Sequence, residues 1–153
     1  MTESRSLSSR VLPGIVLLLV VGVVTYVVAW RSDPPTGPAD LVWDKTACAE
    51  CRMHIGEPAF AAQMRLASGA VVAFDDPGCL FEHLDELQQE TVTGTWFHHL
   101  RDDRWVSADD VSFVTVAPTP MGYGLGAVAA GERDDAISLP AARQRVLDPD
   151  GGR

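Results

Sequence analysis

The longest hydrophobic segment of the chain is residues 11–30, which is rich in Val and Leu and contains no charged residue. A helix rises ~1.5 Å per residue, so these twenty residues are enough to cross a hydrocarbon core of ~30 Å. Arg5 and Arg10 precede the run, and basic residues favour the cytoplasmic side of a membrane. We therefore predict a cytoplasmic segment at 1–10 and a transmembrane signal anchor at 11–30, with the remaining chain on the extracytoplasmic side of the cell membrane.

A cleaved signal peptide is the competing interpretation, because such peptides also begin with basic residues. Their apolar region is ~7–15 residues long and ends in small residues. This run is longer and ends at Trp30, where an aromatic side chain would anchor a helix at the membrane interface. The pattern favours an uncleaved anchor. No cysteine lies near the end of the run for a bacterial lipid anchor.

Beyond a Pro-rich linker at 31–40, the hydrophobic pattern changes to that of a hairpin. In residues 60–66, the apolar residues Phe, Ala, Met and Leu occupy every second position, beginning at 60. This period of two predicts a half-buried strand. Ser and Gly at 68–69 predict a turn, and residues 70–74 predict the second strand.

A helix is predicted directly after this hairpin. Asp76 is a favoured N-cap residue, Pro77 suits the first helical position, and an apolar stripe at helical spacing runs through residues 79–87. The second half of the chain is less regular. Its predicted elements are a strand in 91–100, a strand or a brief helix followed by one in 109–116, a strand at 127–130, and a helix at 138–147 capped by Ser138.

These elements predict a small α+β domain at residues 41–147, built from repeated strand-strand-helix units and followed by a flexible C-terminus at 148–153. The domain is strongly acidic. From residue 33 onward the chain has nine Lys and Arg against twenty Asp and Glu, a net charge of −11. Such a surface is unsuited to nucleic acid or anionic lipid head groups, and it favours cations or a basic partner.

The chemistry-bearing segment is CAECRMH, residues 48–54. Three cysteines is an odd number for an exported domain, in which thiols normally pair. Covalent haem attachment requires His directly after the second cysteine, where this chain has Arg52. A structural zinc site needs four ligands, commonly from two such motifs, and there is no second C-x-x-C. The segment therefore does not predict haem, and a zinc site would have to recruit Cys79 and a histidine, for which the sequence gives no signal.

Two sulfur chemistries remain open for this segment. A thioredoxin-type dithiol formed by Cys48 and Cys51 would lie at the start of a helix, but Gly56 and Pro58 argue against a long helix there. Thr119-Pro120 could act as the proline loop of such a protein. A structural disulfide, Cys48 to Cys51 or Cys51 to Cys79, is the other possibility.

A copper site is the third alternative, and it follows from ligand softness. Thiolate and thioether sulfur bind Cu(I) well. Cys51 and Met53 are two residues apart, so in an extended segment their side chains point to the same side. Met121 lies in a Pro/Gly loop, where ligands are often presented. His54 is either a third ligand or a surface imidazole, and the sequence favours neither.

Other residues of the right chemistry have simpler explanations. We expect Cys79 to be a buried thiol on a helix face, or alternatively to reach the C-x-x-C segment. Met64 suits the apolar face of its strand. His98 and His99 are adjacent, so in a strand they face opposite ways and at most one would join a site. His83 is expected to be an exposed helix residue.

Taken together, three motifs in this order resemble the NosL family of nitrous oxide reductase accessory proteins: C-x-x-C-x-M-H-I at 48–55, F-D-x-x-x-C at 74–79 and T-P-M-G at 119–122. The resemblance covers about residues 42–130. It implies a fold similar to that of organomercury lyase and a Cu(I)-binding chaperone that delivers copper to the reductase. Two features depart from the family: Arg52 stands where Gly is common, and a hydrophobic helix replaces the usual lipid anchor.

The resemblance also implies roles for residues. Cys51 and Met53 match the thiolate and thioether positions, Met121 matches the late methionine, and Cys48 and Cys79 match the other cysteines. The leading hypothesis is a membrane-anchored Cu(I) chaperone without catalytic activity, whose partner is a copper-accepting enzyme or its membrane maturation complex. The rival hypothesis is a thiol-disulfide oxidoreductase that uses Cys48 and Cys51.

Overall fold

The computed structural model describes residues 6–30, 36–87 and 91–148, and for residues 6–12 and 28–30 it describes the backbone alone. The chain divides into two compact units, Met1–Pro35 and Thr36–Arg153. Parts of the predicted cytoplasmic segment, linker and C-terminus, at 1–5, 31–35 and 149–153, lie outside the described residues.

The first unit contains helix α1, Ser6–Trp30. Among the residues that the structure describes, no helix has both the length and the apolar character needed to cross a membrane. The transmembrane anchor at 11–30 and the extracytoplasmic location of the domain stay predictions.

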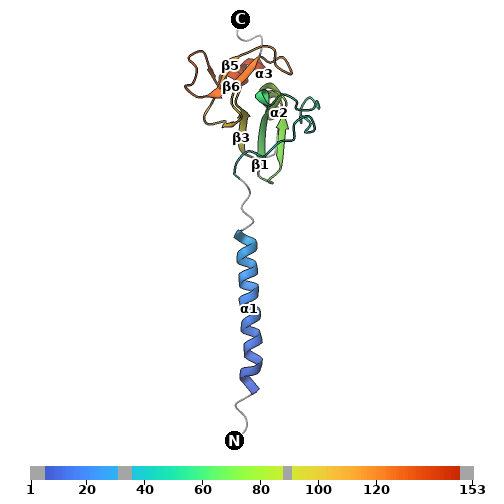
Figure 1. Cartoon of the computed structure of the whole chain (residues 1–153), viewed down its shortest axis with the longest axis vertical. Helices are drawn as coiled ribbons and strands as arrows, with labels where there is room; N and C mark the ends of the chain where they lie inside the picture. Colours follow the sequence, from blue (N-terminus) through green and yellow to red (C-terminus); the bar gives the residue numbers. More distant parts are fainter. Residues whose placement is uncertain (1–5, 31–35, 88–90, 149–153) are drawn as a thin grey trace. The chain divides into compact units, whose positions relative to one another are not determined.

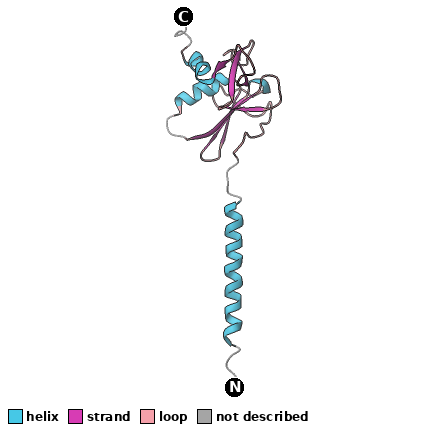
Figure 2. Ribbon diagram, turned by 90° about the vertical axis from the view of Figure 1, so that its left-hand side faces the viewer, coloured by secondary structure: helices cyan, strands magenta, loops and turns pink. Residues whose placement is uncertain are grey.

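In the described part of the second unit, the strands form two antiparallel sheets with two α-helices beside them (Figures 1 and 2). The strand orders are β2-β1-β3-β4 and β6-β5-β7. The elements in chain order are the 3-10 turn η1 Pro58–Phe60, β1 Ala62–Leu66, β2 Val71–Phe74, α2 Pro77–Glu86, β3 Val92–His98, β4 Trp105–Ser107, β5 Val111–Thr115, β6 Leu125–Ala129, β7 Ile137–Ser138 and α3 Leu139–Leu147. The predicted α+β class is confirmed.

A single aromatic cluster holds the two sheets and α2 together. Phe81 of α2, Phe97 of β3 and Phe113 of β5 are each fully buried. Their ring centroids lie 5.0 to 5.8 Å apart, in the tilted and edge-to-face arrangements that aromatic rings prefer. Because each ring comes from a different element, the cluster fixes the position of α2 against both sheets.

The predicted hairpin and helix are confirmed. Strands β1 and β2 pair antiparallel, with Met64 opposite Val72, and Met64 is fully buried as expected. Asp76 is the N-cap of α2, and its side chain accepts a hydrogen bond from the Gly78 N–H. The local pattern was sufficient here because the turn and the cap are specified by neighbouring residues.

The prediction that β1 is half-buried is wrong. All five of its residues are buried, and the expected solvent-side residues Gln63 and Arg65 are only 1% and 6% exposed. The Gln63 amide exchanges two hydrogen bonds with the Ala39 backbone (2.8 and 3.0 Å). Arg65 donates to the Gly37 carbonyl (2.9 Å). The second half of the predicted linker therefore covers this face of the sheet.

The second half of the domain resolves an ambiguity in the prediction. Residues 109–116 contain strand β5, which pairs with β6 and with the short β7. Ser138 is the N-cap of α3, but its side chain makes no capping hydrogen bond. The order β1-β2-α2 follows the strand-strand-helix prediction, whereas β7 intervenes before α3. Likeness to the organomercury lyase fold stays a prediction.

Candidate metal centre

The C-x-x-C segment lies in a small antiparallel loop. The Asp44 N–H donates to the Ile55 carbonyl (2.9 Å), and the Cys48 N–H donates to the Met53 carbonyl (2.8 Å). Arg52 has φ 68°, the left-handed conformation that lets the chain reverse tightly. Cys48 and Cys51 therefore lie in a reverse turn. In a thioredoxin-type protein a helix follows the dithiol, but no helix directly follows these two cysteines.

The third thiol comes from helix α2. Asp76 caps this helix and Pro77 occupies its first turn, so Cys79 lies at its N-terminal end. The sulfur atoms of Cys48, Cys51 and Cys79 all lie within 4.8 Å of one another, and all three cysteines are free. We call these residues the cysteine trio. Neither structural disulfide considered from the sequence is formed.

The sequence prediction placed Cys48, Cys51, Met53, His54 and Met121 in the metal site and left open whether Cys79 joins them. The structure agrees with both descriptions considered for it, since Cys79 is buried at 1% exposure and also reaches the C-x-x-C segment. The backbone shows how the segments meet: the Ala49 N–H donates to the carbonyl of Ala73 in β2 (2.9 Å), two residues before the turn into the helix. The position of a third cysteine directly after a helix cap was the available sequence signal.

Of the three cysteines in the trio, Cys48 loses its proton most readily. A hydrogen bond from Cys79 lowers the pKa of Cys48 to about 5, against the opposing effect of burial, and backbone N–H groups of residues 75, 51 and 50 add to this. The same hydrogen bond to Cys48, followed by burial, raises the pKa of Cys79. Burial is the main cause of the raised pKa of Cys51. Near neutral pH, Cys48 is therefore a thiolate, and it accepts a hydrogen bond from the Cys79 thiol.

Two buried carboxyl groups adjoin this thiolate. Asp75 is 3% exposed and Asp76 is fully buried. Burial raises the pKa of Asp75, and the negative charge of Cys48 raises it further. One oxygen of Asp75, Oδ1, has no hydrogen-bond partner among the described residues. Because buried negative charge is unfavourable unless it is compensated, a cation held by the trio fits this environment.

The remaining predicted ligands lie toward the surface. Met53 is 54% exposed and Met121 is 37% exposed, and His54 is also exposed. Met121 is nevertheless tied to the site through its backbone, since its N–H donates to Asp76 Oδ2 (3.3 Å). Cys51 is the trio member with partial exposure. The structure thus brings Cys48, Cys51 and Cys79 together, tethers the Met121 backbone to the start of α2, and leaves Met53 and His54 exposed.

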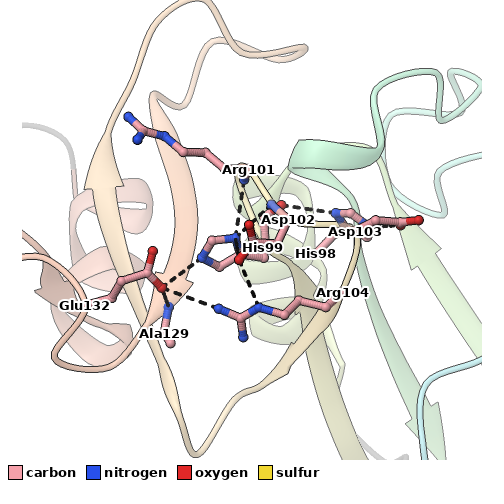
Figure 3. Close-up of polar contacts among 8 residues, drawn as sticks. All are labelled: His98, His99, Arg101, Asp102, Asp103, Arg104, Ala129 and Glu132. Atoms are coloured by element: carbon pink, nitrogen blue, oxygen red, sulfur yellow. Dashed lines mark hydrogen bonds and ion pairs between the residues drawn. The ribbon is translucent and has the colours of Figure 1, made fainter.

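The histidines near the end of β3 form a separate network (Figure 3). His99 is 1% exposed. Its Nδ1 accepts the N–H groups of Arg101 (3.3 Å) and Asp102 (3.0 Å), and its Nε2 faces Glu132 Oε2 (2.9 Å). Since Nδ1 accepts backbone N–H groups, Nε2 carries the proton and donates to Glu132. Both nitrogens of His99 are therefore already bonded within the protein.

His98 is occupied in the same way. It is 5% exposed, and its ring nitrogens face the His99 carbonyl and Asp103 Oδ1, each at 3.2 Å. Its ring packs edge-on against Trp43 and Trp105. Neither histidine belongs to the cysteine trio, and the expectation that at most one of them joins a site stays a prediction.

The search of protein-family models, of curated proteins and of solved structures finds no match to this chain. The case for the metal centre therefore stands on the geometry and chemistry of its own residues.

Proposed function

We propose that this chain is a membrane-anchored Cu(I)-binding chaperone without catalytic activity. The observation that carries the proposal is the cysteine trio: three free thiol sulfurs within 4.8 Å of one another. Thiolates are soft ligands that select Cu(I), Zn²⁺ and iron-sulfur clusters over hard cations. The trio is therefore suited to a soft or borderline metal ion.

Two features favour Cu(I) among these. Structural zinc sites are almost always tetrahedral with four ligands. In the described residues, the trio is the single group of three or more Cys, His, Asp or Glu side chains that is arranged for a metal, and it offers three ligands. Additional sulfur comes from Met53 and Met121, whose thioethers suit Cu(I). We assign Cys48, Cys51 and Cys79 as the core ligands, with Met53, Met121 or His54 completing the site during loading and release.

The difference in exposure among the ligands suggests a direction for transfer. Cys48 and Cys79 are almost completely buried, while Cys51 is partly exposed and Met53 more so. A partner's ligand would reach the ion from the Cys51 and Met53 side, and ligand exchange would move the ion outward. The net charge of −11 from residue 33 onward favours a partner with a basic docking surface.

The cellular setting rests on the sequence. The resemblance to the NosL family supports nitrous oxide reductase or a related copper enzyme, or its membrane maturation complex, as the client. The hydrophobic run at 11–30 supports an anchor in the cell membrane with the domain on the extracytoplasmic side. Fractionation of cells, with protease treatment of spheroplasts, tests the anchor and its orientation.

A competition titration against a Cu(I) chelator tests the metal assignment. We expect about one Cu(I) per chain. Cys51→Ser and Cys79→Ser should each lower the affinity by more than about 100-fold, since even changes outside the ligand set lower metal affinity 10–100-fold. Met53→Leu should lower the affinity about tenfold. The matched control is Met64→Leu, which replaces a fully buried methionine and should leave the affinity unchanged.

Equal affinity for Cu(I) in the wild type and in the Cys51→Ser, Met53→Leu double variant would overturn the assignment. A higher affinity for Zn²⁺ than for Cu(I) when both are buffered would show that the trio serves a different metal.

The second candidate is a thiol-disulfide oxidoreductase, and the lowered pKa of Cys48 is the observation in its favour. The burial of Cys48 weighs against it. Thiol exchange needs a thiolate that the substrate can reach, but Cys48 is 1% exposed, and the accessible Cys51 has a raised pKa. A thiol-exchange assay separates the two functions, because oxidoreductase activity would survive Met53→Leu and require both Cys48 and Cys51.

A further inference from the structure

The loop at residues 119–124, which we call the methionine loop, packs against the first turn of α2. The ring of Tyr123 lies over Gly78, where a Cβ atom would be only 2.1 Å from Tyr123 Cγ. The Tyr123 hydroxyl donates to Glu82, one turn further along the helix. The loop therefore has close contact with the same helical turn that carries Cys79.

Asp76 lies between the loop and the helix and is hydrogen-bonded to both. Its Oδ1 accepts the Gly78 N–H at 3.0 Å, and its Oδ2 accepts the Met121 N–H at 3.3 Å. The Thr119 side chain also lowers the pKa of this carboxyl group, and Thr119 Oγ1 accepts the Gly124 N–H at 3.2 Å. One carboxylate thus joins the helix start to the methionine loop.

A helix cap alone does not account for this arrangement. Ser or Asn can cap a helix as well as Asp does, and without a charge. Asp76 has no exposed surface, and a buried carboxylate is unfavourable unless several donors compensate it. The donors here come from both sides of the contact between loop and helix, so the carboxylate holds together two segments that are more than forty residues apart in sequence.

We propose that Asp76 is a positioning residue for the metal centre: it holds the methionine loop against α2, so that Met121 can contribute its thioether to a Cu(I) ion bound by the cysteine trio. This inference rests on the proposed function. Asp76 itself does not contact the ion, and its effect on the affinity passes through Met121.

A double-mutant cycle tests this role. We expect Asp76→Asn to lower the Cu(I) affinity about tenfold, the lower end of the effect of residues that orient metal ligands. Met121→Leu should have an effect of similar size. If Asp76 acts through Met121, the double variant should be about tenfold weaker than wild type, because the two changes remove the same contribution, and not the ~100-fold weaker that independent effects would give.

The matched control is Asp75→Asn. Asp75 is the neighbouring carboxylate and is also buried, but the backbone group that lowers its pKa is that of Gly56, which lies outside the methionine loop. Its effect on Cu(I) affinity should combine additively with Met121→Leu. X-ray absorption at the copper edge gives an independent readout: Asp76→Asn should lower the number of sulfur neighbours as Met121→Leu does, whereas Asp75→Asn should not.

Thermal unfolding of each metal-free variant shows whether it is folded. If Asp76→Asn is unfolded, Thr119→Val carries the same test, since it removes the hydroxyl that favours the Asp76 carboxylate and accepts the Gly124 N–H, and Thr119→Ser should restore the affinity. Additive effects of the Asp76 and Met121 changes, or an unchanged sulfur count in Asp76→Asn, would overturn the inference while leaving the copper assignment intact. Equal Cu(I) affinity in wild type and Cys51→Ser would overturn both.

Discussion

The cysteine trio and the histidine pair contain the two side-chain types that most often bind transition metals, yet the fold treats them in opposite ways. Each ring nitrogen of His98 and His99 faces a carbonyl, a carboxylate or backbone N–H groups. The three thiols lie within 4.8 Å of one another, and the largest hydrogen-bond effect on the pKa of Cys48 comes from Cys79 itself.

This difference shows that burial and ligand chemistry do not by themselves make a metal site. A donor atom is available to a metal when the protein has not already satisfied it. The histidine network joins the end of β3 to the loop after β6, as the Glu132 contact in Figure 3 shows, so its hydrogen bonds contribute to the fold. The thiols of Cys51 and Cys79, by contrast, can release their protons when a metal ion binds.

Proton release should give the largest effect that separates the two regions. With Cys48 ionised and the pKa of Cys51 and Cys79 raised, binding to three thiolates should release two protons per Cu(I) near neutral pH. The affinity should then rise about 100-fold per pH unit, tenfold for each proton. Titration in weakly buffered solution with a pH indicator measures the release.

Cys51→Ser is the control, because it keeps the hydrogen bond between Cys48 and Cys79 and should release one proton fewer. A pH dependence that follows the histidines, and disappears in His98→Gln, would contradict the comparison.

Removal of the His99 ring should affect stability without affecting copper. His99→Ala leaves the N–H groups of Arg101 and Asp102 without their acceptor and removes one of the donors to Glu132, and we expect it to lower the free energy of unfolding by about 2 kcal/mol. Urea unfolding measures the change. Arg101→Ala is the matched control, since it retains the backbone N–H that bonds to His99, and it should change stability by less than ~0.5 kcal/mol.

The Cu(I) affinity of folded His99→Ala should equal that of the wild type. A tenfold loss in the folded variant would mean that the histidine network contributes to the metal centre.

The smallest expected effect concerns the turn that carries the cysteines. Arg52 has φ 68°, and the left-handed conformation is unfavourable by ~1–2 kcal/mol for most residues but not for Gly. Arg52→Gly should therefore stabilise the metal-free protein by about 1 kcal/mol, as measured by thermal unfolding. Asp44→Gly is the control at φ 60°, and it should give a smaller gain, because Asp tolerates this region better.

A loss of stability in Arg52→Gly would show that the arginine side chain contributes contacts that outweigh the strain of its backbone.

The elements that the sequence predicted well are those specified by near neighbours. The hairpin of β1 and β2 and the Asp76 cap depend on residues within a few positions of one another, so the period of two and the capping preference were enough. The burial of Gln63 and Arg65 was missed, because Ala39 and Gly37, which cover them, lie more than twenty residues earlier. Periodicity reports the faces of a strand but not what the rest of the chain places on them.

The candidate site likewise contains residues that the sequence indicated and one residue that it left open. The order of Cys48, Cys51 and Met53 indicated soft-metal chemistry from ligand type and spacing alone, and Met121 drew attention because a Pro/Gly loop has no core to bury it. Whether Cys79 joined these residues was left open, as its local pattern fits a buried helix residue equally well.

By itself, then, the amino-acid sequence determined the α+β class, the hairpin and helix around residues 60–86, and the concentration of sulfur ligands at 48–53. Only the tertiary structure decided that Cys79 completes a trio, that His98 and His99 are engaged elsewhere, and that Asp76 joins the methionine loop to α2. The physical reason is that hydrophobic periodicity, capping and ligand softness are properties of neighbouring residues. Which thiols meet, and which donors are already satisfied, depends on how distant segments pack around the Phe81, Phe97 and Phe113 cluster.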